Sequence, residues 1–398
     1  MSEKRRDNKG RILRTGESQR PDGRYRYKYT DRFGKEKSEY SWKLVPTDRV
    51  PKGKRDCLSL REKEALIRKD LADGIDPAGK KMTVCELYAK QNAQRGNVKD
   101  STKEARKQLM RILKEDKLGA RSIDSVKLSD AKEWAIRMKN RGFSYQTISN
   151  HKRSLKASFF IAIEDDYIRK NPFQFYLGDV IEDDRKKKEA LTEEQETALL
   201  TFIRQDKIYQ KYYDEIVLLL KTGLRISEFC GLTVRDIDFE NGLISVNHQL
   251  IKGKKGRYYI DTPKTKSGVR YVPLSEEAIQ ALHRVLGRRG HAQPIEIDGH
   301  SDFVFLNRKG CPKVSADYEA LMKRIVAKYN KGRKRKDALP KTTPHTLRHT
   351  FCTRLAHKNM NPKDLQYIMG HSSISITLDW YAHASVDSAK AEIKRLVA

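Results

Sequence analysis

The first part of the chain alternates polar and aromatic positions in a way that is typical of β-strands. In Arg24-Tyr25-Arg26-Tyr27-Lys28-Tyr29 a cation and a tyrosine follow each other at every step. A strand with this order carries the tyrosines on one face and the cations on the other. Pro21-Asp22-Gly23 before the run is a turn signal. Ser38–Leu44 predicts a second strand, and Ile12-Leu13-Arg14 with its neighbours offers a third.

From residue 60 onward the period becomes helical, because the apolar positions of Leu60–Leu71 fit a short amphipathic helix. The pattern therefore predicts an N-terminal domain, residues 1–75, in which one helix covers a three-stranded sheet. The cationic face of such a sheet stays open and can enter the major groove of DNA. An ordinary sheet with Lys and Arg on its solvent side has the same pattern.

The next segment, residues 82–172, shows helical periodicity and no convincing strand. Ser101-Thr102-Lys103-Glu104 resembles an N-terminal capping signal, further helices begin near Leu128 and Tyr145, and Asn171-Pro172 ends the unit. We expect a helical second domain here, bounded by linkers at residues 76–81 and 174–190.

A third domain, residues 190–398, opens with the capping box Thr192-Glu193-Glu194-Gln195. Helices dominate it, apart from a stretch between Leu243 and Pro273 that predicts two or three antiparallel strands. The expected fold class is a multidomain, mainly α protein with small β elements, whose last domain mixes α and β.

Charge narrows the choice of partners. The chain of 398 residues has 83 Lys and Arg against 53 Asp and Glu, a formal net charge of +30. A polyanion compensates such a charge best, and nucleic acid releases counterions when cations neutralise its phosphates. A solvated basic surface is the alternative.

The longest apolar runs are far below the ~20 residues that cross a bilayer, and the start lacks a signal peptide. We expect a cytoplasmic protein without membrane contact.

Four short motifs in the third domain carry candidate chemistry. Arg225 follows Gly223, which interrupts an apolar helix, and Glu228 is placed to hold its guanidinium. Thr343-Pro344 is a helix start that places His345 and Arg348 on one face. His371 follows Gly370, a natural helix stop, and Tyr381 lies in Trp380-Tyr381-Ala382-His383.

Each motif alone also has an ordinary structural interpretation. Arg225 alone would more often be a salt-bridge partner, and a single Tyr381 would more often belong to the core. His345 and His349 have the spacing of a zinc pair, but Arg348 would place a fixed cation beside the metal. Thr346 also stands where the acid of a zinc-binding helix would be. A metal site is therefore not expected.

Together these residue types suit the cleavage of a phosphodiester. Two guanidiniums on its non-bridging oxygens remove the repulsion against an attacking anion and stabilise the transition state. A tyrosine with a pKa near ~10 is a usable nucleophile when a histidine accepts its proton. A lysine can protonate the leaving 5′-oxygen. The covalent phosphotyrosine keeps the energy of the broken bond, so neither metal, ATP nor another cofactor is expected.

The ordered set Arg225, lysine, His345-x-x-Arg348, His371 and Tyr381 resembles the tyrosine recombinase (phage-type integrase) family, over about residues 190–398. TGLRISE, HTLRHT, MGHSS and WYAH each lie close to the family pattern. The three-domain plan also resembles integrases of conjugative transposons from Gram-positive bacteria. The resemblance implies that Arg225 and Arg348 clamp the phosphate, that His345 is the general base and that His371 donates a hydrogen bond. It also implies that Tyr381 is the nucleophile.

The catalytic lysine has two candidates in the hairpin Pro263–Arg270. Lys266-Ser267-Gly268 resembles the family's Lys-x-Gly turn better than the segment around Lys264 does, so we assign the role to Lys266. The other lysine would then contact a phosphate near the minor groove.

The resemblance also implies the partners. An integrase of this kind integrates and excises a mobile element through a 3′-phosphotyrosyl intermediate, on double-stranded DNA with core-type and arm-type sites and on target DNA. It acts as a DNA-bound tetramer in the bacterial cytoplasm, associated with the nucleoid, and an excisionase and a host DNA-bending protein are its accessory partners. The apolar face of Ala389–Val397 predicts a tail helix that docks on its own domain or on a neighbouring protomer.

Two other functions fit parts of the sequence. A type IB topoisomerase uses the same residues without exchanging strands between partners, but the basic N-terminal sheet favours recombination. A non-catalytic DNA-binding regulator would keep only the fold, whereas here every residue type that the chemistry needs is present.

Overall fold

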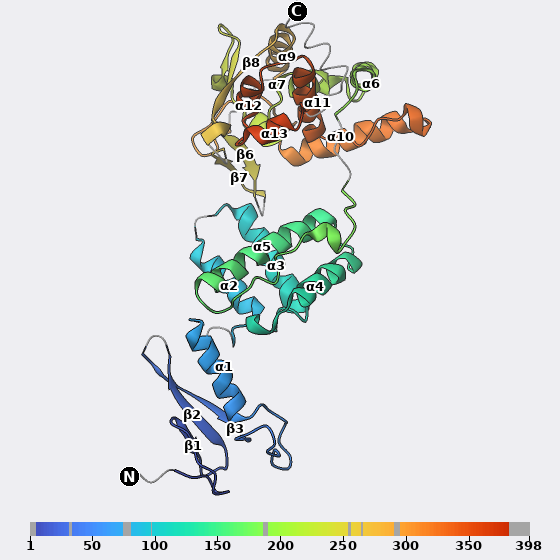
Figure 1. Cartoon of the computed structure of the whole chain (residues 1–398). Helices are drawn as coiled ribbons and strands as arrows, with labels where there is room; N and C mark the ends of the chain where they lie inside the picture. Colours follow the sequence, from blue (N-terminus) through green and yellow to red (C-terminus); the bar gives the residue numbers. More distant parts are fainter. Residues whose placement is uncertain are drawn as a thin grey trace, which may run out of the picture. The chain divides into compact units, whose positions relative to one another are not determined.

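The structure is a computed structural model that describes residues 5–31, 34–74, 81–96, 98–185, 190–253, 256–263, 266–289 and 295–381. The chain divides into two compact units, Met1–Lys186 and Lys187–Ala398, each of which can be followed in Figure 1. The tail Ala389–Val397 lies outside the described residues.

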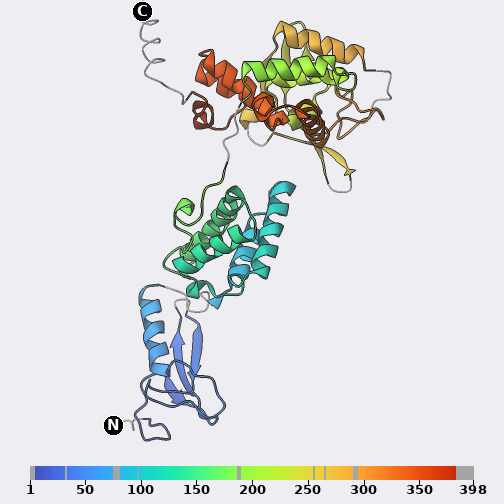
Figure 2. The same cartoon turned by 90° about the vertical axis from the view of Figure 1, so that its right-hand side faces the viewer.

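The N-terminal part of the first unit is the expected three-stranded sheet with one helix. Strands β1 (Glu17–Gln19), β2 (Tyr25–Thr30) and β3 (Glu36–Ser41) pair antiparallel in the order β1-β2-β3. Tyr25 and Tyr27 are buried, whereas Lys28 is exposed. Helix α1 (Leu60–Ala72) packs on the tyrosine face through Leu60 and Ile67 and runs along the sheet in Figure 2. The predicted alternation of faces is confirmed.

The third strand lies elsewhere than predicted. It is Glu17–Gln19, not Ile12-Leu13-Arg14. Glu17 pairs with Tyr27 in the sheet register, and its buried carboxylate accepts a hydrogen bond from Arg61 of α1 at 3.0 Å. This long-range ion pair, which the local apolar pattern does not encode, joins the strand to α1.

The rest of the first unit is helical in its described residues, with a core that includes Trp134, Phe159 and Phe173. Helix α3 starts at Asp100, so the capping signal expected at Ser101–Glu104 lies within its first turn. A helix that was not predicted separately precedes it, started by a capping box between Thr83 and Glu86. The four helices are α2 (Val84–Gln94), α3 (Asp100–Glu115), α4 (Leu128–Asn140) and α5 (Tyr145–Glu164).

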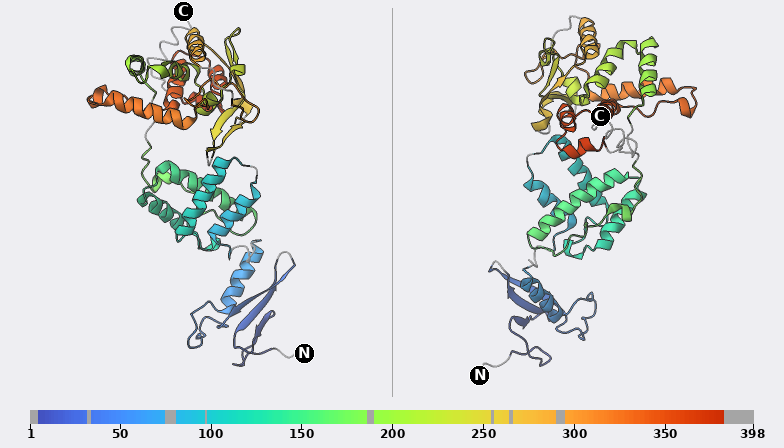
Figure 3. Two further views of the ribbon diagram at one scale, coloured as in Figure 1. Left: turned by 180° about the vertical axis from the view of Figure 1, so that it is seen from behind. Right: turned by 45° about the horizontal axis from the view of Figure 1, so that its top comes forward.

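The second unit is built around α7 (Tyr213–Thr222), of which Ile216–Leu220 are fully buried. The capping box at Thr192 starts α6, as predicted. Helix α10 extends beyond the rest of the unit as the orange helix of Figure 3. The other helices are α6 (Glu193–Gln205), α8 (Ile226–Gly231), α9 (Glu276–Gly287), α10 (Ser315–Asn330), α11 (Pro344–His357), α12 (Pro362–Met369) and α13 (Ile374–Leu378).

Four strands of the second unit lie within the predicted stretch Leu243–Pro273, one more than the two or three expected, and a fifth, β4, precedes it. One sheet has the order β4-β5-β8, and β6 with β7 forms a separate hairpin. Their bounds are β4 (Ile237–Asp238), β5 (Leu243–Val246), β6 (Gln249–Lys252), β7 (Tyr258–Asp261) and β8 (Arg270–Pro273). The predicted fold class, mainly α with small β elements, is confirmed. Within the described ranges no helix combines the length and apolarity that a membrane span requires.

Candidate active site

A break between two helices places Arg225. Helix α7 ends at Gly223, whose φ of 59° is left-handed. A Cβ atom there would lie 2.3 Å from the ring of Phe351, so both the backbone conformation and the space require glycine. The chain then turns, and Arg225 becomes the N-cap residue of α8.

Arg225 is held on one side and open on the other. Its Nη1 donates to Oε1 of Glu228 at 2.7 Å, and its Nη2 donates to the carbonyl of Gly370 at 2.6 Å. The side chain is still 38% exposed. A guanidinium fixed in this way is preorganised, so its remaining N–H groups can bind an anion without a conformational rearrangement.

Arg348 lies beside it but is buried. Thr343 caps α11 and Pro344 starts it, as the sequence predicts. Nη1 of Arg348 donates to the carbonyl of Gly223 at 2.6 Å, and Nη2 donates to the carbonyl of Met369. Burial, and next the charge of Arg225, lower the pKa of Arg348 to about 9. The two predicted phosphate clamps are thus brought together, because they bind the adjacent carbonyls of Met369 and Gly370.

His371 follows directly. Gly370 ends α12 with a left-handed φ of 60°, and Nδ1 of His371 lies 3.0 Å from Oγ1 of Thr377. Burial, and then the charges of Arg348 and Arg225, lower the pKa of His371 to about 4. The ring is therefore neutral at pH 7 and can donate one hydrogen bond to a phosphate oxygen.

His345 stands at the exposed edge of the same site, in the first turn of α11. Its ring lies 4.2 Å from the ring of His349, and its charge acts on His371. A cavity of about 780 Å³ between α10 and α11 reaches His345.

Tyr381 is placed differently. Its hydroxyl donates a hydrogen bond to the carbonyl of Met360 at 2.5 Å, and the ring of Trp380 lies 4.6 Å from that of His349. Burial, and then Cys352, raise the pKa of Tyr381. Its hydroxyl therefore faces the connection between α11 and α12, and no hydrogen bond to the arginines is found within the described ranges.

The structure describes only part of the turn that holds the two candidate lysines. Lys264 is outside the described residues. Lys266 begins a short 3₁₀ turn that ends at Gly268, but its side chain lies outside the description. A Cβ atom on Gly268 would lie 2.4 Å from Cβ of Pro263, so the turn is tight.

Sequence reasoning assigned no role to Arg270. Its side chain is fully buried on β8 and donates from Nη2 to Glu228 at 2.9 Å. A signal was present, because Arg270 precedes Val272 by two residues and period two places both on the inner face. An arginine at an inward strand position requires a buried acceptor.

The electrostatics of the site suit an anion. Three guanidiniums, Arg225, Arg270 and Arg348, act on one buried carboxylate, Glu228. Burial alone would raise the pKa of Glu228, but Arg270 and the other arginines outweigh it and lower that pKa. Three cationic side chains and one anionic side chain give the site a net positive charge, which favours the binding of a phosphate. In the described part of the chain no group of three or more His, Cys, Asp or Glu could hold a metal ion.

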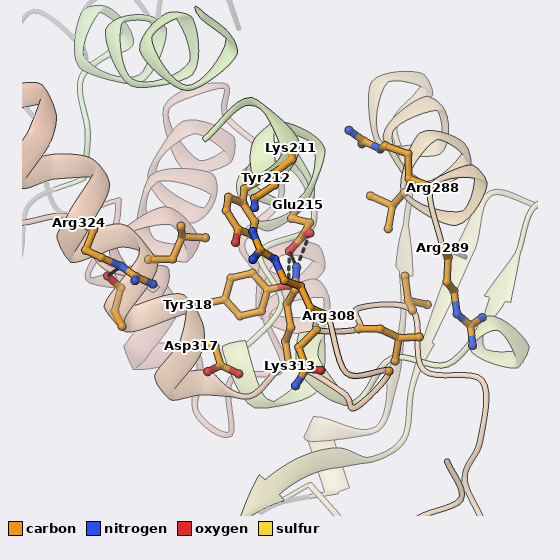
Figure 4. Close-up of a pocket in the computed structure, with 17 residues that line it drawn as sticks. Lys211, Tyr212, Glu215, Arg288, Arg289, Arg308, Lys313, Asp317, Tyr318 and Arg324 are labelled. Atoms are coloured by element: carbon orange, nitrogen blue, oxygen red, sulfur yellow. Dashed lines mark hydrogen bonds and ion pairs between the residues drawn. The ribbon is translucent and has the colours of Figure 1, made fainter. Parts of the chain in front are cut away.

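A cavity of about 700 Å³ lies at the other end of α7, away from Gly223. Figure 4 shows Glu215 at its centre, whereas Arg289 points away, and Arg288 donates to the neighbouring Asp214. Glu215 accepts hydrogen bonds from Lys313 at 2.6 and 2.8 Å and from the hydroxyl of Tyr318 at 2.5 Å. Its central polar groups therefore bind one another, and none of the predicted catalytic residues lines it.

Comparison with known proteins gives two family matches. Residues 189–387 match the phage integrase family, and residues 1–71 match the DNA-binding domain of Tn916 integrase. The transposase of transposon Tn1545 from Streptococcus agalactiae is 65% identical over 396 residues, which are 100% of this chain and 97% of the relative. The transposase of transposon Tn916 from Enterococcus faecalis matches with the same identity and coverage.

A solved structure is also similar. The Tn1549 transposon integrase, in complex with transposon right end DNA, is 60% identical to this chain. The match has a TM-score of 0.76 and covers 80% of this chain and 100% of the other.

Proposed function

The chain belongs to the phage integrase family, and from this premise we propose that Arg225, Arg348 and His371 bind the phosphate at which it cuts DNA. The observation that carries the proposal is the pair of adjacent carbonyls, of Met369 and Gly370, that hold the two guanidiniums side by side. Paired guanidiniums and a neutral histidine donor match the oxygens of one phosphate.

At the level of the whole protein, the predicted resemblance to integrases of conjugative transposons is confirmed, because relatives match over the full chain. The chain is a site-specific tyrosine recombinase that cleaves and rejoins DNA to integrate and excise a mobile element. The topoisomerase and the non-catalytic regulator are set aside, since the full-length relatives are transposases.

The proposed reaction uses only side chains. Oη of Tyr381 attacks the phosphorus, its proton passes to His345, and the bond from phosphorus to the 5′-oxygen breaks. Lys266 protonates the leaving 5′-oxygen. The 3′-phosphotyrosyl bond keeps the energy of the broken bond, so a 5′-hydroxyl reverses the step without ATP. The arginines take the charge-neutralising part that a metal ion has in other phosphoryl-transfer enzymes.

Cleavage requires the phenol of Tyr381 to leave Met360. We attribute this movement to assembly on DNA, in a tetramer on core-type sites, with the tail Ala389–Val397 docking in cis or in trans. The Tn1549 integrase, solved with transposon end DNA and with a circular intermediate DNA, supports a DNA-bound working form. The three-domain division at residues 1–75, 82–172 and 190–398 stays a prediction.

The other partners belong to the same proposal. The N-terminal domain binds arm-type sites, and the match of residues 1–71 to the Tn916 DNA-binding domain supports this. An excisionase and a host DNA-bending protein assist the reaction on DNA in the nucleoid.

The test is covalent capture on DNA. The full-length protein is incubated in EDTA, without ATP, with a nicked suicide substrate from the ends of its element, and SDS-resistant adducts are counted. Wild type and the control Tyr329→Phe should form the adduct, whereas Tyr381→Phe should bind the DNA and form none. An adduct with Tyr381→Phe, or none with wild type, would contradict the proposal.

A further inference from the structure

Arg270 connects three segments of the site through one buried guanidinium. Its Nε donates to the carbonyl of Ile368 at 2.6 Å, and its Nη1 donates to the carbonyl of Gly268 at 3.0 Å. Both Nη atoms also donate to Glu228, at 3.2 and 2.9 Å. These bonds reach the end of α12, the turn Lys266–Gly268 and α8, so the group binds protein and not substrate. That turn connects β7 and β8, which belong to different sheets, so Pro263–Arg270 is not the hairpin that the sequence predicts.

Glu228 is shared between Arg270 and Arg225. Oε1 accepts from Nη1 of Arg225 at 2.7 Å as well as from Arg270, and Oε2 accepts from the backbone N–H of Arg225 at 2.9 Å. Because Arg270 also donates to both oxygens of this carboxylate, the guanidinium of Arg225 donates to it through Nη1 alone. Nη2 of Arg225 remains on the carbonyl of Gly370.

The packing leaves little room for another arrangement. A Cβ atom on Gly370 would lie 3.0 Å from Nη1 of Arg270 and 3.1 Å from its Cζ. The guanidinium therefore packs closely against Gly370, which precedes His371 and accepts a hydrogen bond from Arg225. A movement of Arg270 would be transmitted to Gly370 and from there to the two proposed phosphate ligands.

We propose that Arg270 is a positioning residue for strand cleavage, which fixes Glu228 and Gly370 so that Arg225 meets the scissile phosphate in one orientation. The inference rests on the function proposed above. Arg270 touches no substrate and acts through Arg225. A lysine at this position would keep the charge but could not reach Ile368, Gly268 and Glu228 together, because an ammonium lacks the planar fork.

A double-substitution cycle tests the coupling. Rates of adduct formation at saturating suicide substrate are measured for wild type, Arg270→Lys, Arg225→Lys and the double variant, and DNA affinity is measured separately. Arg270→Lys should lower the rate by about 10²-fold, the scale of a ~1 Å misplacement, with affinity within about threefold. The double variant should be no more than about threefold slower than Arg225→Lys alone, because coupled residues are not additive.

The matched control is Arg354→Lys. Arg354 forms another ion pair of this unit with a buried carboxylate, at 2.7 Å from Nη1 to Glu196, and has no proposed part in cleavage. Its rate should stay within about threefold of wild type, since it shares no partner with Arg225. If Arg270→Lys and Arg225→Lys multiply in the double variant, Arg270 does not act through Arg225 and the inference is wrong.

Glu228→Gln provides a second route should Arg270→Lys fail to fold. It keeps the shape of the side chain but weakens the hydrogen bonds that Glu228 accepts from Arg270 and Arg225. Measured below the alkaline limb set by Arg348, it should show the same lack of additivity with Arg225→Lys. Multiplicative rates would again overturn the positioning role. Absence of an adduct from wild type would instead overturn the proposed function, and the inference with it.

Discussion

The hydroxyl of Tyr381 donates its hydrogen bond to the backbone carbonyl of Met360, at a distance of 2.5 Å. Burial also raises the pKa of this phenol, so the group keeps its proton at neutral pH and its hydrogen bond is used within the protein. A phenol is a weak nucleophile until a base takes its proton. Cleavage therefore depends on two events, release from Met360 and transfer of the proton.

The first prediction concerns that transfer. His345→Ala should slow adduct formation at pH 7 by about 10²-fold or more, as the loss of a general base does. Part of the rate should return as the pH rises above 7 while it stays below the pKa of Arg348 of about 9, because hydroxide then replaces the missing base. Single-turnover cleavage at several pH values measures both effects.

The control for this prediction is the neighbouring ring. His349→Phe keeps an aromatic side chain against Trp380, which lies 4.6 Å from His349, and should retain a pH profile parallel to that of wild type. Equal pH profiles for His345→Ala and wild type would remove His345 from the role of base.

The second prediction concerns the alkaline limit of the reaction. Arg348 binds phosphate only while charged, and burial and Arg225 lower its pKa to about 9, whereas Glu228 raises it. Glu228→Gln removes that support, so the pKa of Arg348 should fall further. The alkaline limb of kcat/KM, which reports the free enzyme, should move to lower pH. Glu277→Gln, whose carboxylate pairs with Lys221, is the control, and an unmoved limb in Glu228→Gln would count against the prediction.

Local chemistry explains why much of the site could be predicted. Thr343 and Pro344 start α11, and Gly223 and Gly370 end α7 and α12 with left-handed backbones. Each of these signals acts within a few residues, so the sequence alone places Arg348 on its helix. Glu228 lies three residues from Arg225, within the same short range.

Long-range partners explain what was missed. Arg270 binds Ile368, 98 positions away, and no local pattern specifies that contact. The third strand was placed wrongly because Glu17 is fixed by Arg61 of α1. The direction of the Tyr381 hydroxyl depends on how the segment after α12 folds back to Met360, which no spacing in the sequence encodes.

The third prediction concerns the helix break beside Arg225. Gly223→Ala forces a Cβ atom into a left-handed residue and 2.3 Å from the ring of Phe351, and should lower the free energy of unfolding by more than about 1 kcal/mol. Cleavage should also fall, because the carbonyl of Gly223 holds Arg348. Gly287→Ala is the control, since nothing lies within 4 Å of its Cβ position. Thermal unfolding and adduct formation are measured for both variants. Equal stability and equal cleavage in Gly223→Ala and Gly287→Ala would contradict the steric argument.

The last prediction concerns acid stability in the N-terminal part. Asp48 accepts from Arg11 at 2.8 Å and from the N–H groups of Leu44 and Val45 at 2.8 and 3.2 Å. Burial alone would raise its pKa, but these bonds outweigh it and lower the pKa. A carboxyl group whose pKa is lowered by folding stabilises the protein above its unfolded pKa of about 3.9. That contribution is lost as the pH falls through the folded value.

Asp48→Asn should therefore destabilise the sheet by about 1–3 kcal/mol at pH 7, the range for hydrogen bonds to charged groups, and should make its stability less dependent on pH below about 5. Hydrogen exchange of the β2 amides in the full-length protein, compared between variant and wild type at each pH, measures both changes. Asp56→Asn is the control, because the Asp56 side chain is 85% exposed and its pairing with Lys43 is screened by water. If the two variants exchange alike at pH 7, the bonds to Asp48 do not stabilise the sheet.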